Sequence, residues 1–216
     1  MNIKYCIWDF NGTLLDDVEI GIMSVNQLLQ ERGLPILSCK EDYYSVFGFP
    51  IIDYYRRLGF DFEKEPYEKI APLWVDLYLE NVKNAGLFSD VEETLKSIKR
   101  CGICQVIISA TEQNMLNEQL RSLGIEEFFD EAMGLDNIHA GSKLYIAKQW
   151  REKHSGKAIF IGDTDHDAET AKALGAECYL IARGHQSKEY LERHTDARIF
   201  DDLVSLIKYL EIKADK

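Results

Sequence analysis

A mostly apolar segment that ends at a carboxylate, with a glycine close behind, most constrains how this chain folds. The run from Ile3 to Trp8 meets Asp9, and Gly12 follows three positions later. Such a run is typical of a buried strand, and a glycine beside it lets the backbone turn sharply where an anion approaches. The segment therefore predicts a strand that delivers Asp9 to a sheet edge, which is how a doubly wound fold presents a nucleophile.

The next part of the chain has the hydrophobic period of helices. Apolar residues recur at three- and four-residue spacing, which predicts helices at 17–33, 40–47, 50–58 and 64–82. No convincing strand pattern interrupts them. We therefore predict an all-helical cap, residues 16–85, inserted after the first strand.

From about residue 87 strands and helices alternate. Strands are predicted at 106–109, 128–133, 158–161, 177–182 and 197–200, and helices at 91–102, 112–122, 142–153, 166–174 and 203–210. This alternation predicts a parallel sheet with helices on both faces. The expected fold class is α/β, with a doubly wound, Rossmann-like core formed by residues 1–15 and 86–216.

The charge of the chain restricts its partners. Its net charge is −12, which disfavours nucleic acid and anionic membranes as partners. No apolar run approaches the roughly 18 residues of a membrane helix. Five cysteines and no signal-peptide pattern predict reduced thiols in a cytoplasmic protein, for which a monomer or weak homodimer suffices. Cys101 and Cys104 are interpreted as flanking a helix-ending turn.

Reactive side chains follow the predicted strands. Asp9 and Ser109 end two of them, Asp163 and Asp167 follow a third, and Lys143 opens the helix before that third strand. In a doubly wound sheet, ligands bind beyond the carboxyl ends of the strands. A carboxylate there can attack phosphorus, carboxylates can hold magnesium, and a lysine and a hydroxyl can bind phosphoryl oxygens. The set therefore favours phosphoryl transfer.

These motifs resemble the four motifs of the haloacid dehalogenase-like superfamily. They read Asp-Phe-Asn-Gly-Thr-Leu from Asp9, then Ser109, Lys143 and Gly-Asp-Thr-Asp-His-Asp ending at Asp167. The predicted insertion resembles the helical cap of phosphoglycolate phosphatase-like and β-phosphoglucomutase-like members. The resemblance implies a magnesium-dependent phosphatase of small phosphorylated metabolites.

The resemblance also implies catalytic and metal-binding roles. Asp9 would be the nucleophile and a magnesium ligand, and residue 11 would bind the metal through its main-chain carbonyl. Asp163 would be a further ligand. Asp167 would complete the metal site by holding a metal-bound water, or would hold Lys143.

Further positions would bind the phosphoryl group. Ser109 and Ala110 would contact it at the end of their strand, and Lys143 would neutralise its charge and steady the nucleophile. Gly12 and Thr13 would shape the turn that leads toward the cap.

Asn11 departs from the family pattern, which has an aspartate acting as general acid/base at this position. An amide neither gives up nor accepts a proton near neutral pH, and general acid–base catalysis is typically worth about 10²–10⁴-fold. Three interpretations stay open: a preference for good leaving groups such as acyl or aryl phosphates, another acid in its place, or slow hydrolysis by a phosphoryl-binding protein. The nearest candidates for another acid are Asp16, Asp17, His139 and His166.

Rival functions and structural roles remain. A metal-free dehalogenase would not need the acidic pair Asp163 and Asp167, although carboxylates at a helix start are also favoured as caps. A phosphomutase would need the acid/base that Asn11 lacks, and a catalytically impaired regulatory protein would not. Thr111 is expected to cap the helix that follows it, and the loop around Arg183 is a candidate substrate contact.

Overall fold

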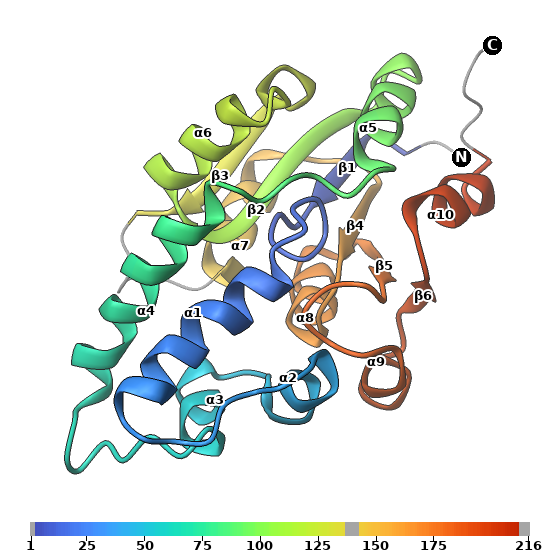
Figure 1. Ribbon diagram of the computed structural model, residues 1–216. Coiled ribbons are helices and arrows are strands. Elements are labelled where there is room, and N and C mark those ends of the chain that lie inside the picture. Colours follow the sequence, from blue (N-terminus) through green and yellow to red (C-terminus); the bar gives the residue numbers. More distant parts are fainter. Residues whose placement is uncertain (1–2, 137–142, 212–216) are drawn as a thin grey trace. The chain divides into compact units, whose positions relative to one another are not determined.

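The computed structural model describes residues 3–136 and 143–211, and the chain forms two compact units. One unit contains residues 1–15 and 87–216, and the other contains residues 16–86. The first unit alternates strands and helices, and the second consists of helices joined by loops (Figure 1). None of the helices in the described ranges has the length and apolar character needed to cross a bilayer.

The first unit is built on a parallel sheet in the order β3-β2-β1-β4-β5-β6. Its strands are β1 Tyr5–Trp8, β2 Cys104–Glu112, β3 Glu131–Leu135, β4 Ala158–Gly162, β5 Glu177–Ile181 and β6 Arg198–Phe200. Its helices are α5 Val91–Arg100, α6 Gln113–Ser122, the short 3-10 helix η1 Glu126–Phe128, α7 Lys143–Lys153, α8 Asp165–Leu174, α9 Lys188–His194 and α10 Leu203–Tyr209.

Helices cover both faces of the sheet because alternate strand residues are apolar on both sides. On one face Ile7, Val106 and Phe160 pack with α7 and α8 in a single buried cluster. On the other face Gln105 donates to the Leu95 carbonyl of α5. The predicted α/β class, the doubly wound parallel sheet and the all-helical insertion are confirmed.

The second unit has four helices and, within residues 16–86, no strand. The helices are α1 Val18–Glu31, α2 Lys40–Val46, α3 Ile51–Arg57 and α4 Tyr67–Val82. The apolar stripe of α1 packs with Tyr54, Tyr55 and Ile70 in a core of its own. Several of the aromatic side chains between residues 43 and 55 therefore form the interior of this unit.

The structure differs from the sequence-based prediction at three places in the first unit. The strand predicted at 128–133 lies at Glu131–Leu135, because η1 occupies the residues before it. The predicted strand at 106–109 extends to Glu112 through an irregular pairing with β3. Helix α9, which no prediction covered, begins where the Ser187 side chain accepts a hydrogen bond from the backbone of Tyr190.

Candidate active site

The candidate site lies where the strand order reverses. Strand β1 is in the middle of the sheet, and the chain goes to one side through β2 and β3 and to the other through β4, β5 and β6. Ligands of open α/β sheets bind beyond the strand ends at such a switch point. Asp9 directly follows β1 and Asp163 directly follows β4, so both carboxylates lie at this edge of the sheet.

A glycine turn allows the chain to pass close to the acidic groups. Gly12 has a φ of +71°, a conformation that disfavours other residues. A Cβ at this position would lie 2.4 Å from Asp163 Oδ2. The turn brings the Thr13 hydroxyl to 3.0 Å from Asp163 Oδ1 and 3.3 Å from Asp9 Oδ2. Glycine at residue 12 is therefore required by both the backbone and the site.

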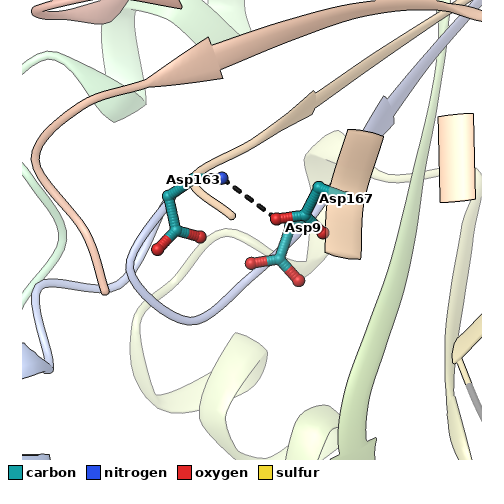
Figure 2. Close-up of side chains that lie close together, drawn as sticks. All are labelled: Asp9, Asp163 and Asp167. Atoms are coloured by element: carbon teal, nitrogen blue, oxygen red, sulfur yellow. Dashed lines mark hydrogen bonds between the residues drawn. The ribbon is translucent and has the colours of Figure 1, made fainter. Parts of the chain in front are cut away.

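Three buried carboxylates gather around this turn. Asp9, Asp163 and Asp167 each offer an oxygen within 4.8 Å of the others, and Figure 2 shows the three side chains close together. The ammonium group of Lys143, itself buried, contacts both Asp9 and Asp167. One lysine thus faces three carboxylates within this cluster.

Asp167 has both a structural and a site role. Its Oδ2 accepts hydrogen bonds from the backbone of Asp163 (3.1 Å) and from the backbone and hydroxyl of Thr164 (3.0 and 2.8 Å), as part of the capping box of α8. Its Oδ1 binds Lys143. The contact with Lys143 is one of the two predicted roles of Asp167, and its role toward a metal-bound water stays a prediction.

Burial and neighbouring charges set the protonation of these groups. Burial raises the pKa of Asp9 to about 6, although the Lys143 ammonium acts in the opposite direction. Burial raises the pKa of Asp163 well above its usual value, and the other two carboxylates add to this effect. Burial alone would lower the pKa of Lys143, but the contacts with Asp167 and Asp9 outweigh it and raise this pKa, so the lysine is charged.

The donor set fits a hard divalent cation. Magnesium prefers oxygen ligands and is commonly bound through one or two carboxylates together with waters and substrate phosphate. Asp9 and Asp163 supply such oxygens, and the buried excess of negative charge is what a cation would neutralise. The main-chain carbonyl of Asn11, predicted as a further ligand, belongs to the same turn.

We expect magnesium alone to stabilise the protein. A ligand present at about 100 times its dissociation constant contributes about 2.7 kcal/mol, which corresponds to a rise of about 5–10 °C in melting temperature for a chain of this size. Differential scanning calorimetry with and without MgCl₂, at constant ionic strength, measures the shift.

The matched variant for this measurement is Asp163→Asn. An asparagine oxygen can still accept a hydrogen bond from the backbone N–H of His185, as the carboxylate does at 2.6 Å. The asparagine nitrogen can donate to the Thr13 hydroxyl, which keeps its own bond to Asp9. The magnesium shift should disappear, and the metal-free variant should be no less stable than the wild type because one buried like charge is gone. An undiminished shift in this variant would contradict the site.

The end of β2 places a chain of polar groups beside the turn. Ser109, 1% exposed, accepts from the Thr111 N–H at 3.1 Å and donates to the Thr111 hydroxyl at 3.1 Å. The Thr111 hydroxyl in turn donates to Asn11 Oδ1 at 2.8 Å. The prediction that Thr111 caps the next helix is wrong, because the side chain of Glu112 caps α6 by accepting from Asn114 and Met115.

Most of the sequence matches a known family. The model of the haloacid dehalogenase-like hydrolases matches residues 6–181, which include each of the strand-end motifs described above. The chain belongs to this family of hydrolases.

Relatives of this haloacid dehalogenase-like hydrolase span its full length. A phosphoglycolate phosphatase of Vibrio parahaemolyticus is 24% identical over 99% of this chain and 98% of its own length. The pyrophosphatase PpaX of Halalkalibacterium halodurans is 22% identical over 99% and 100%. A haloacid dehalogenase-like family protein from Streptococcus pneumoniae has the same fold, with a TM-score of 0.81 at 22% identity over 96% of this chain and 98% of that one.

The remaining candidates of the sequence lie in different surroundings. His166, on α8, is half-buried, and burial together with Lys143 lowers its pKa. His139 lies outside the described residues. Asp16 and Asp17 belong to the other unit, where Asp17 accepts a hydrogen bond from the Tyr78 hydroxyl at 2.6 Å. None of these observations assigns a replacement acid.

The Arg183 loop, a candidate substrate contact, makes structural contacts in this hydrolase. Arg183 binds both oxygens of Asp90, at 2.7 and 2.8 Å, donates to the Thr13 carbonyl at 3.2 Å, and lies 4.0 Å over the ring of Phe88. Further along the loop, the His185 N–H donates to Asp163. The loop therefore holds the Gly12 turn through the Thr13 carbonyl and contacts the acidic cluster at Asp163, a role that no local motif indicated.

Proposed function

We propose that this chain is a magnesium-dependent phosphatase of small phosphorylated metabolites, similar to the phosphoglycolate phosphatases, that acts through an aspartyl-phosphate on Asp9. The observation that carries the proposal is the position of Asp9. It lies at the switch point of the sheet, in contact with Lys143 and grouped with Asp163 and Asp167 within 4.8 Å. The names of the full-length relatives support the choice of a phosphorylated compound as the substrate.

In the first half of the reaction, an oxygen of Asp9 attacks phosphorus and the bond to the leaving oxygen breaks. Lys143 holds the nucleophile in place and offers positive charge to the phosphoryl oxygens. The Ser109 hydroxyl, which donates to Thr111 in this structure, turns to donate to the phosphoryl group instead. When bound by Asp9, Asp163 and the Asn11 carbonyl, magnesium supplies charge neutralisation for the approaching phosphate. Water then hydrolyses the aspartyl-phosphate and regenerates the carboxylate.

The alternative is a phosphoryl-binding or regulatory protein with little turnover, and Asn11 favours it. The amide cannot protonate a leaving alkoxide, so esters of ordinary alcohols would react slowly. A metal-free dehalogenase is disfavoured by the site, because three buried carboxylates against one lysine would repel a substrate acid.

The substitution Asn11→Asp separates these possibilities. Magnesium-dependent hydrolysis is measured with p-nitrophenyl phosphate, whose leaving group needs no proton, and with an alkyl phosphate, whose leaving group does. A carboxyl group at residue 11 should raise kcat on the alkyl phosphate by about 10²-fold and change kcat on the aryl phosphate by less than about tenfold.

Each outcome has a clear meaning. No gain on the alkyl phosphate would show that residue 11 is not the missing acid. A wild type that binds magnesium and inorganic phosphate but hydrolyses neither ester, while Asn11→Asp hydrolyses both, would favour the binding protein over the phosphatase.

A further inference from the structure

A side-chain path connects the predicted phosphoryl-binding hydroxyl to the residue that departs from the family pattern. Ser109 lies 3.1 Å from the Thr111 hydroxyl, and that hydroxyl lies 2.8 Å from Asn11 Oδ1. Asn11 and Thr111 are 100 residues apart in the chain, so the fold itself brings them together. Thr111 is the middle member of this path, and the proposed mechanism above does not use it.

The local backbone holds Thr111 in this place. Between Ile108, which pairs with Met133, and Glu112, which pairs with Leu135, four residue steps of β2 face two of β3. Irregular pairing of this kind redirects side chains and is common beside active sites. Gly134 of β3 lies so close to this bulge that a Cβ would meet the Thr111 carbonyl at 2.5 Å.

The contact with Thr111 fixes the orientation of a planar amide. Asn11 Oδ1 accepts a hydrogen bond from the Thr111 hydroxyl. The Nδ2 group therefore lies on the other side of the carboxamide, and the direction of its N–H bonds is set. Such a group is a hydrogen-bond donor that keeps its protons. It occupies the side-chain position at which the family pattern has a proton donor.

We propose that Thr111 is a positioning residue that aims Asn11 Nδ2 at the leaving-group oxygen of the phosphate ester. The inference rests on the proposed phosphatase function and deepens it. As Asp9 forms its bond to phosphorus, the bond to the leaving oxygen breaks and the oxygen takes the electron pair. Asn11 stabilises this charge by a hydrogen bond, and the proton that neutralises the product comes from water.

The arrangement selects a substrate class. A hydrogen bond stabilises a departing anion without protonating it, so the site suits leaving groups that depart as anions near neutral pH. Aryl phosphates, acyl phosphates and phosphoanhydrides belong to this class, whereas phosphate esters of simple alcohols do not. The donor matters most for the poorer members of the class, because more charge develops on their leaving oxygen.

The test uses the full chain with magnesium and a series of aryl phosphates of graded leaving-group pKa. Thr111→Val keeps the shape of the side chain and removes the hydroxyl, and Thr111→Ser is the matched control that keeps it. We expect Thr111→Val to lower kcat about tenfold for phenyl phosphate and less than about twofold for 2,4-dinitrophenyl phosphate, which steepens the leaving-group dependence. Thr111→Ser should restore the wild-type slope.

A second measurement separates positioning from a general loss of packing. In an Asn11→Ala background, Thr111→Val should have no further effect on the slope, because the two residues act through one hydrogen bond. The side-chain amide signal of Asn11 in ¹⁵N NMR spectra should shift in Thr111→Val and return in Thr111→Ser, without any substrate present.

The outcomes distinguish this inference from the proposed function. Two results would overturn the positioning role and leave the phosphatase intact. One is an active wild type whose dependence of kcat on leaving-group pKa is the same in Thr111→Val. The other is a double variant in which the effects of the two substitutions multiply. A wild type without magnesium-dependent turnover on any of the esters would overturn the phosphatase and the donor role with it.

Discussion

Replacing Asp9 by asparagine is expected to abolish magnesium-dependent phosphate hydrolysis, with a fall of at least about 10³-fold in kcat. The side chain at this position is the nucleophile of the proposed mechanism, and an amide oxygen does not attack phosphorus. The loss should be as large for p-nitrophenyl phosphate as for an alkyl phosphate, because a better leaving group does not replace the attacking group. Phosphate release measured over several hours sets the lowest turnover that the assay can detect.

The Asp9→Asn variant should remain folded, and this makes the result interpretable. Asparagine has the same shape, its oxygen can still accept from Lys143, and the lysine keeps Asp167 as a charged partner. Asp201→Asn is a matched control, because Asp201 forms an exposed ion pair with Lys188 and such pairs contribute little to stability. Residual turnover above about one tenth of wild type in Asp9→Asn would show that the nucleophile is another group.

The parts of the site that could be predicted follow from one rule about parallel sheets. Asp9 and Asp163 end apolar runs, and the carboxyl ends of parallel strands meet at one edge. A helical period and a strand period are different enough that the insertion could be separated from the core. Lys143 has no such signal in its own surroundings and stands out only by its position at the start of the helix before β4.

The supporting contacts could not be predicted, because they join distant parts of the chain through irregular backbone. Arg183 and Asp90 are 93 residues apart and neither belongs to a motif. The sequence predicts a helix cap at Thr111, because nothing in it indicates the irregular pairing of the strand after Ile108. One signal was present, since Ser109 and Thr111 are two residues apart and therefore share a face if the strand continues.

Replacing Lys143 by methionine is expected to cost about 3–5 kcal/mol of unfolding free energy in the absence of magnesium, and to abolish turnover. The ammonium group lies between Asp9 and Asp167, is 3% exposed, and is the cation that both carboxylates contact. Removing one partner of a buried ion pair leaves uncompensated charge in a low-dielectric environment. Methionine fills a similar volume, so the loss reports the charge and not a cavity. Urea unfolding with EDTA present measures it.

A double variant tests whether the charge accounts for this loss. If the unpaired carboxylates cause it, Lys143→Met should cost less in an Asp167→Asn background, where one of the two negative charges has been removed. Magnesium should restore part of the stability of Lys143→Met, because a cation held by Asp9 and Asp163 neutralises the same cluster. Lys143 would act through packing alone if the losses of unfolding free energy simply added in the double variant and magnesium restored no stability to Lys143→Met. In that case the acidic cluster would not need a cation, and the case for magnesium at this site would fail with it.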